Sequence, residues 1–487
     1  MARTRFGLLP LAFAGLASVS CTTSTDSNVV ASFVVTPNPV KLIRGDSTDL
    51  SVTPVDAEGH LVTGISVVFV SNDSDMVTVS FAGRAKSRGP VGATSIQVIG
   101  GGAVTEVPVT VFPRPVAVRV APTDTTMFQG QTFQLTATAF DSTGALIPGA
   151  PVTFESQDNT IATVSAAGLV GAHGPGTVYI AAEVGTLYAL SHVAVRDSAL
   201  GERVPLAGRP FAAAVSPSGV AYVSLADLGQ LTRATLPSHS FSNPVAVGSQ
   251  PTEVVFNSTG TRAYVTNQYG HNVGIVNVAT NTQVDTITVR GDPFAVVVTP
   301  GDSIIYVTTN ADSVYGFRLA TKERIAAFPT FATANGFVVR GDTLLYVSTR
   351  AGGAVIEFNL KTRTVARTLA VGGMPQKMLV SQDGNQLYIA NEGGFVQFWN
   401  LVTGAQIGEN LILPGSAGYA IARRPNTGKL YVTTAYFGGG RIYIVDPTTR
   451  TITRTLVAGG STRQVVFNAS GTVGFVPNEY GWVDFLK

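Results

Sequence analysis

The chain has 487 residues, a formal net charge of +2, 45% hydrophobic residues and only 13% charged residues. The ordinary apolar content excludes a disordered chain, and 52 Gly with 26 Pro favour short strands and tight turns over helices. A single Cys excludes a disulfide framework and a cysteine-based zinc site. The length predicts about three domains.

The first twenty residues are typical of an export signal. Two Arg residues are followed by an uncharged, mostly apolar run, 6–19, which is too short to span a bilayer as a helix. Small residues before Cys21 resemble the lipobox of bacterial lipoproteins, although Ser18 stands where that family usually has Leu. The resemblance implies that residues 1–20 are a signal peptide and that a lipid on Cys21 binds the membrane. The alternative is an ordinary cleaved signal with an incidental Cys.

The chain that follows the signal carries no excess charge. Residues 21–30 are expected to form a tether, and removing the signal leaves 30 basic and 30 acidic side chains. Nucleic-acid binding needs a basic surface, so we expect no nucleic-acid partner. No later segment has 18 consecutive apolar residues, so no other membrane span is predicted. By analogy with lipoproteins, Thr22 lacks the Asp that retains some of them at the inner membrane, which favours lipid anchoring at the outer membrane.

The first half of the chain repeats with a period of 85 residues. Turn residues recur in one register without a gap, as Gly45 and Gly130 do, or Asp56 and Asp141. Alternating strands separated by turn signals about every ten residues predict a sandwich of about seven strands in each copy.

These two copies resemble the bacterial immunoglobulin-like (Ig-like) domains of group 2. The resemblance implies Ig-like sandwiches over residues 31–112 and 113–197. Domains of this family are typical of envelope and surface proteins, including adhesins. The residues that carry the resemblance are Gly45, Leu50, Asp56, Gly59, Gly130, Leu135, Asp141 and Gly144.

The second half repeats about every 42 residues. Its marker is an aromatic residue that is followed by Val in six of seven copies. Four short strands in each unit of this length indicate a β-propeller. The run from Tyr264 to Asn267 reads YVTN, and residues 200–487 resemble the YVTN family of propeller repeats. The markers are Tyr222, Tyr264, Tyr306, Tyr346, Tyr388, Tyr431 and Phe475.

The two ends of this region predict how the ring closes. Residues 482–487 align with a third strand, and no fourth strand follows them. Residues 202–210 align with the fourth-strand segments of other copies, so we expect them to complete the last blade. The predicted fold is all-β: two Ig-like sandwiches followed by a seven-bladed β-propeller closed by an N-terminal strand.

Up-and-down connectivity gathers the loops between second and third strands on the same face as the loops that lead into each first strand. Polar residues two positions after the Pro that begins a first strand are expected at the mouth of the channel. If the propeller has a ligand site, we expect it at this mouth. The alternative is that Asn is favoured in these loops because it tolerates left-handed backbone and caps turns. The candidate ligand-face residues are Glu253, Asn335, Lys377, Gln464, Asn391, Glu392, Asn478 and Glu479.

The sequence gives little support to the hypothesis of an enzymatic function. Only His239 and His271 lie in the propeller region, and no His/carboxylate cluster has metal-ligand spacing. No Gly-x-Ser-x-Gly nucleophile elbow occurs, and two Trp are too few for a quinoprotein-like cofactor site. We therefore predict no catalytic residues, no metal and no cofactor.

The order of anchor, spacers and terminal head favours a cell-envelope lipoprotein. In this hypothesis the propeller is a binding, possibly adhesive, head for a protein, peptide or glycan. The alternative is an envelope enzyme or cofactor-binding redox protein that uses the mouth of the channel. A third hypothesis is that the propeller is a structural platform without a ligand of its own.

Overall fold

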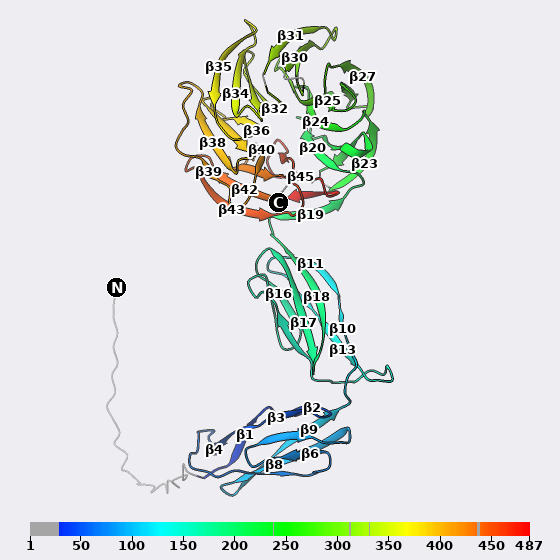
Figure 1. Ribbon diagram of the computed structural model, residues 1–487, viewed down its shortest axis with the longest axis vertical. Coiled ribbons are helices and arrows are strands. Elements are labelled where there is room, and N and C mark those ends of the chain that lie inside the picture. The colour runs from blue at the N-terminus through cyan, green and yellow to red at the C-terminus, as the bar shows by residue number, and fades with distance from the viewer. Residues whose placement is uncertain (1–28, 237, 311–312, 331, 436–438) are drawn as a thin grey trace, which may run out of the picture. The chain divides into compact units, whose positions relative to one another are not determined.

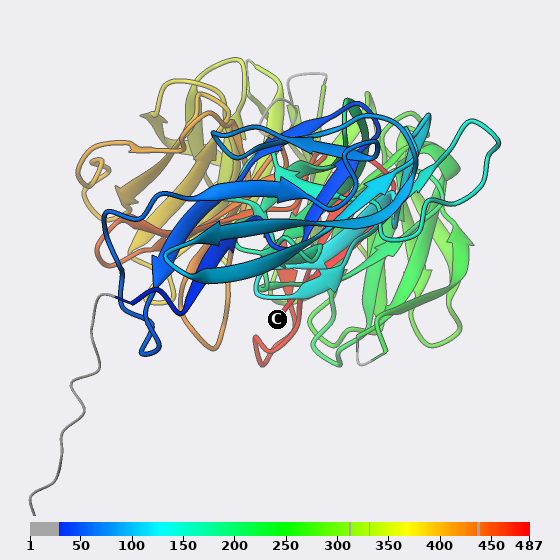
Figure 2. The same cartoon turned by 90° about the horizontal axis from the view of Figure 1, so that it is seen from below.

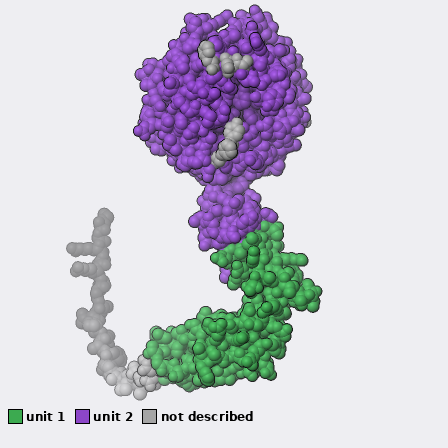
Figure 3. Space-filling model, viewed as in Figure 1, with its two compact units in different colours: residues 1–123, 135–155, 181–191 green, residues 124–134, 156–180, 192–487 purple. Residues whose placement is uncertain are grey.

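The computed structural model describes residues 29–487 except 237, 311–312, 331 and 436–438. The predicted signal peptide, Cys21 and most of the tether lie outside the described residues. Within them, regular structure is β-strand apart from one short 3-10 helix, η1 (Ala226–Leu228). Figure 3 colours two compact units, which consist of residues 1–123, 135–155 and 181–191, and of residues 124–134, 156–180 and 192–487.

The first sandwich is built from two main sheets and a strand pair. The sheets have the orders β2-β9-β8-β5 and β3-β7-β6, and β1 pairs with β4. Its core contains Val40, Val77 and Ile96, which are fully buried because alternate residues of each strand face inward. The strands are β1 (Ser32–Thr36), β2 (Val40–Ile43), β3 (Ser47–Asp49), β4 (Ser51–Val55), β5 (Val68–Ser71), β6 (Val77–Val79), β7 (Arg84–Ser87), β8 (Gly92–Gly100) and β9 (Ala103–Phe112).

The second sandwich repeats this topology. Its sheets have the orders β11-β18-β17-β14 and β12-β16-β15, and β10 pairs with β13. The Asp56 and Asp141 carboxylates accept backbone N–H groups two and four residues on, and Gly59 and Gly144 have positive φ, as the predicted turns require. The strands are β10 (Ala117–Ala121), β11 (Asp124–Phe128), β12 (Thr132–Gln134), β13 (Thr136–Phe140), β14 (Thr153–Ser156), β15 (Ala162–Val164), β16 (Leu169–Ala172), β17 (Gly176–Val184) and β18 (Leu187–Arg196).

The remaining described residues form seven four-stranded sheets arranged in a ring (Figure 1). Figure 2 shows these blades edge-on, with green blades on one side and yellow and orange blades on the other. Neighbouring inner strands contact one another around the ring, and β44 (Val466–Phe467) contacts both β40 (Gly418–Arg423) and β20 (Pro210–Val215). The predicted seven-bladed propeller is confirmed.

Each of the first six blades runs from an inner to an outer strand in chain order. The first three blades are β20, β21 (Ala221–Leu225), β22 (Gln230–Thr235), β23 (Ser240–Ala246); β24 (Pro251–Phe256), β25 (Arg262–Asn267), β26 (Asn272–Asn277), β27 (Thr282–Thr288); and β28 (Pro293–Val298), β29 (Ile304–Thr309), β30 (Ser313–Arg318), β31 (Arg324–Pro329). The next three are β32 (Ala334–Arg340), β33 (Leu344–Thr349), β34 (Ala354–Asn359), β35 (Thr364–Ala370); β36 (Pro375–Val380), β37 (Gln386–Asn391), β38 (Phe395–Asn400), β39 (Leu411–Ile412); and β40, β41 (Leu430–Thr434), β42 (Arg441–Asp446), β43 (Thr451–Val457).

The seventh blade is assembled from both ends of the propeller region. Its order is β19-β46-β45-β44, with β19 (Leu200–Pro205) on the outside against β46 (Trp482–Leu486), which pairs with β45 (Gly474–Asn478). The strand β19 runs antiparallel to β46, and Val204 lies opposite Val483. This is the predicted closure by an N-terminal strand.

The repeated markers form the core between the blades. All seven aromatic markers lie on second strands and are at most 6% exposed. In four blades an Asn or Asp before the outer strand closes the predicted turn, since Asn277, Asn359, Asn400 and Asp446 each accept a backbone N–H two residues on. Packing and turn chemistry therefore explain most of the 42-residue repeat.

Candidate functional site

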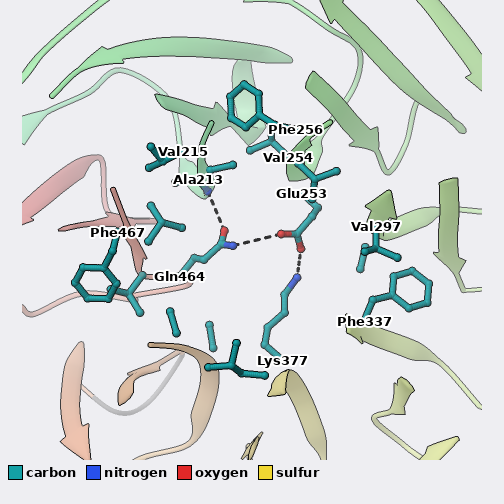
Figure 4. Close-up of a pocket in the computed structure, with 18 of the residues that line it drawn as sticks. Ala213, Val215, Glu253, Val254, Phe256, Val297, Phe337, Lys377, Gln464 and Phe467 are labelled. Carbon is teal, nitrogen blue, oxygen red and sulfur yellow. Dashed lines mark hydrogen bonds and ion pairs between the residues drawn. The ribbon is translucent and has the colours of Figure 1, made fainter. Parts of the chain in front are cut away.

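The inner strands of the propeller surround a central chamber of about 700 Å³. Its wall is mostly aliphatic, and residues such as Val254, Val296, Met378 and Ile421 line it. We call this cavity the chamber (Figure 4). Its size and lining fall within the range of small-molecule sites in proteins.

One ring of equivalent positions supplies the polar groups at one end of the chamber. In the first six blades, each of these positions lies two residues after the first residue of the inner strand. In the last blade it lies two residues after Thr462, because Thr462 forms a bridge with Asn478 that is equivalent to the pairing of Pro251 with Asn267. In four blades the position holds Ala or Gly, and in three it holds a long polar side chain. The seven residues are Ala212, Glu253, Ala295, Gly336, Lys377, Ala420 and Gln464.

The three long side chains of this ring meet across the channel. The Lys377 ammonium donates to Glu253 Oε2, and Gln464 Nε2 donates to Glu253 Oε1 at 3.3 Å. Gln464 Oε1 accepts the backbone N–H of Ala213 at 2.8 Å (Figure 4). We call Glu253, Lys377 and Gln464 the polar trio. They come from the second, fifth and seventh blades, so only the closed ring brings them together.

Burial affects the ionisation of Lys377. The side chains of Lys377 and Glu253 are 17% and 8% exposed. Loss of hydration in this apolar channel lowers the pKa of Lys377 to about 7. The ion pair with the Glu253 carboxylate acts in the opposite direction, because it stabilises the ammonium form of Lys377.

Asn335 does not join the trio, although it was expected at the same level. Ala334 pairs with Thr349 and Gly336 with Ser348, so Gly336 occupies the position of Glu253. Asn335 instead donates to Gln376 Oε1 at 2.9 Å. Gly336 lies ten positions before its marker Tyr346, whereas Glu253 lies eleven positions before Tyr264, so counting back from the marker points to Asn335, one residue too early.

A second ring of side chains covers the trio on the loop face, the face that carries the loops between second and third strands. The Arg463 guanidinium lies over the rings of Phe211 and Tyr419, 5.0 Å and 4.7 Å from their centroids. Phe211 packs edge-to-face against Phe294, with centroids 6.3 Å apart. We call Phe211, Phe294, Tyr419 and Arg463 the aromatic layer. It lies between the trio and the loop face, where Phe294, Tyr419 and Asn335 also line a smaller pocket of about 220 Å³.

Glu479 holds the aromatic layer in place. Its Oε2 accepts Arg463 Nε at 2.7 Å and Ser461 Oγ at 2.8 Å, and its Oε1 accepts Arg209 Nη1 at 2.8 Å. Burial by itself would raise the pKa of Glu479, but hydrogen bonds and charge from Arg463 outweigh it and the pKa is lowered. The carboxylate is thus a stable part of an ion-pair network.

The other candidate residues of the loop face form turns and ion pairs. Asn478 is fully buried, accepts from the N–H groups of Ser461 and Tyr480, and donates to the carbonyl of Gly459. Asn391 makes the equivalent bonds in its own blade. These are the bonds that the turn-chemistry alternative predicts. Glu392 accepts two hydrogen bonds from Arg350, at 2.9 Å and 2.6 Å.

Exposed apolar side chains project from the loop face on three consecutive blades. Tyr480 of the seventh blade is 71% exposed, Leu228 of the first 46% and Tyr269 of the second 58%. Each lies in the connection between the second and third strands of its blade. We call these residues the apolar triplet. Exposed aromatic side chains are enriched where proteins bind partners.

One sequence signal indicates the aromatic layer, whereas none indicates the chamber. The position before the trio's ring holds Phe211, Tyr419 and Arg463, and aligning the inner strands at that position would have predicted the aromatic layer. The chamber itself has no local signal, because its apolar wall residues resemble those of any buried strand.

The described residues contain neither a candidate metal site nor a candidate membrane-spanning helix. Among them, no group of three or more His, Cys, Asp or Glu side chains could hold a metal ion. Among the same residues, no helix has the length and hydropathy that crossing a bilayer requires.

Comparisons with known proteins identify one part of the chain. Residues 116–188 match the bacterial Ig-like domain (group 2), a domain typical of bacterial cell-surface and adhesion-type proteins. No curated protein sequence matches the chain. Among solved structures, hydrazine synthase from Kuenenia stuttgartiensis is similar, with a TM-score of 0.52 and 15% identity, covering 60% of this chain and 98% of that chain. At this identity the likeness concerns the fold alone.

Proposed function

We propose that this protein is a cell-envelope lipoprotein that presents its propeller as a binding head on Ig-like spacers. The match of residues 116–188 to an Ig-like family of surface proteins supports the location. The export signal and the lipobox-like sequence before Cys21 support a lipid anchor, and Thr22 supports the outer membrane. The YVTN resemblance of residues 200–487 supports a propeller head, with a protein, peptide or glycan as its partner.

The apolar triplet is the observation that carries the binding role. A closed propeller needs no exposed aromatic side chains on its loops, because its core lies between the blades. Tyr side chains offer contact area together with a hydroxyl group, which suits protein and glycan partners. The buried side chains of Asn478 and Asn267 donate to backbone carbonyls beside the loops that carry Tyr480 and Tyr269, so these loops are held in shape before a partner arrives.

Binding to envelope material tests the head. The full chain carrying Tyr269→Ser and Tyr480→Ser should lose most of its binding to purified envelope fractions and to a glycan array. The matched control replaces Tyr179 and Tyr188 by Ser, since both are exposed on the second sandwich. Equal binding by the two double variants and the unaltered chain would overturn the role of the loop face.

Fractionation tests the anchor separately. With Cys21 present, the protein should incorporate labelled palmitate and sediment with outer membranes. Cys21→Ser should abolish the label and release the protein to the soluble fraction. A Cys21→Ser protein that still sediments with membranes would contradict the lipid anchor and leave the binding test of the head unaffected.

A further inference from the structure

The two ends of the chamber have different linings. Exposed residues of the hairpins between first and second strands, Pro217, Ser258 and Pro425, line its outer end. We call that side the hairpin face. At the other end lie the buried trio and, beyond it, the aromatic layer. The chamber is thus an apolar cavity with its polar groups at the end away from the hairpin face, and we expect a small molecule to enter from the hairpin face, opposite the loops where a ligand was expected.

The trio at the inner end of the chamber keeps unused hydrogen-bond donors. A Lys ammonium has three N–H donors, and within the part of the chain that the structure describes Glu253 is the hydrogen-bond partner of Lys377 Nζ. Gln464 Nε2 has two N–H donors and gives one to Glu253, while its Oε1 is occupied by Ala213. Lys377 and Gln464 together can therefore donate to an acceptor atom of a ligand.

Charge at this end favours an uncharged acceptor. The carboxylate of Glu253 already balances the Lys377 ammonium. A ligand carboxylate would face Glu253 in a desolvated cavity, and a ligand cation would compete with Lys377 for it. A carbonyl oxygen meets the spare donors without adding a charge.

We propose that the chamber binds an apolar small molecule that carries an uncharged carbonyl group at one end. The hydrocarbon part lies against Val254, Val296 and Met378, and the carbonyl oxygen accepts hydrogen bonds from Lys377 and Gln464. This site lies on the side of the propeller away from the apolar triplet and does not depend on the proposed partner of the loop face.

The probe for the test is 6-propionyl-2-dimethylaminonaphthalene, an uncharged fluorophore with one ketone. It is titrated into the full chain carrying Cys21→Ser, so that no attached lipid binds it. We expect a saturable blue shift of its emission with one site per chain. Val297→Trp should abolish the shift, because Val297 is half-buried and lines the chamber. Val284→Trp, at an exposed position on β27, is the matched control and should bind normally.

The polar end is tested with a second pair of variants. Lys377→Met should weaken binding about tenfold, the loss expected for a hydrogen bond from a charged donor. Lys429→Met is the matched control, because Lys429 pairs with Asp446 in another ion pair of the propeller and does not line the chamber. Gln464→Leu removes the second donor and gives the same readout if Lys377→Met does not fold.

Competition with the probe tests which polar group the ligand carries. Undecan-2-one should displace the probe at lower concentration than undecane or undecanoate. Absence of a saturable shift, equal binding by Val297→Trp and Val284→Trp, or displacement by undecanoate as effective as by the ketone would each overturn the proposal.

Discussion

Arg203 and Asp484 form a two-point ion pair across the strands that close the ring, with Nε–Oδ1 at 2.8 Å and Nη2–Oδ2 at 2.9 Å. Asp484 is fully buried and also accepts Arg196 Nη2 at 2.5 Å and Trp482 Nε1 at 3.1 Å. The Arg203 guanidinium lies 4.2 Å from the ring centroid of Trp482. The seventh blade therefore has a charged clasp in addition to its strand pairing.

Asp484→Asn should destabilise the propeller strongly. It leaves two partly buried guanidinium groups without their counter-charge, and breaking a buried pair costs about 3 kcal/mol or more. Urea unfolding followed by Trp fluorescence measures the change. Asp285→Asn is the control, because Asp285 pairs with Lys322 at a half-exposed site and such pairs contribute at most about 1 kcal/mol. Equal losses in the two variants would show that the clasp contributes no more than a surface pair.

The Lys377 amine should make stability depend on pH above neutrality. Its pKa is about 7 in the folded chain against an ordinary 10.5, so between these values the unfolded chain binds more protons. The free energy of unfolding should therefore rise with pH, by at most about 1.4 kcal/mol per pH unit from this group. Denaturant titrations between pH 7 and 9.5 measure the slope and stay below the ordinary pKa of the Tyr side chains.

The double variant Glu253→Gln with Lys377→Met is the control that tests whether Lys377 causes this slope. It removes both charges of the pair together, so neither is left alone in the channel. The slope should flatten while the fold is kept. An unchanged slope in the double variant would assign the pH dependence to other groups.

Glu479 should stabilise the head against acid. Its pKa is lowered in the folded chain, so its contribution is present above the ordinary value of 4.5 and is lost as pH falls below that value. Glu479→Gln should lower stability at pH 7 and show a shallower further loss below pH 4.5. Thermal melts across pH 3–7 measure this, with exposed Glu323→Gln as the control. Parallel pH profiles for the two variants would argue against a special role of Glu479.

Asn478→Ala should destabilise the seventh blade by about 2 kcal/mol, because it leaves buried backbone groups without partners. The loss should exceed that of Asn385→Ala, at an exposed hairpin position, which should stay within about 0.5 kcal/mol. Gly460→Ala should act like Asn478→Ala, since a Cβ at Gly460 would overlap Asn478 Oδ1. If Asn478→Ala leaves stability unchanged but abolishes binding by the loop face, the side chain is a contact residue instead.

The sequence predicted the parts of the fold that depend on local chemistry. The aromatic markers and turn residues locate every blade, because each blade buries the same side chains and closes the same turns. The partner of β46 could also be predicted, since residues 202–210 resemble the missing fourth strand. The register of Asn335 was missed, because one residue fewer between the channel position and the marker Tyr346 changes which side chain reaches the channel.

The site was harder to predict than the fold. Glu253 and Lys377 are 124 residues apart and meet only across the closed ring. Their inward position was predicted, but not their pairing. The aromatic layer depends on Arg463 stacking between side chains of the first and sixth blades. Such contacts arise from the geometry of the ring, which no single repeat encodes.

The pairing of β19 with β46 also has a consequence for biosynthesis. The residues of the Arg203–Asp484 clasp are separated by 281 positions, whereas the six other blades join strands from adjoining segments. Those six can form one after another as the chain is made, from hairpins with low loop-closure entropy. The seventh blade cannot be completed until β46 is available, at the end of the propeller region. Until then β19 has no partner strand and is an unpaired edge. Chaperones that shield such edges are expected to engage this protein late in its maturation, after the first six blades have formed.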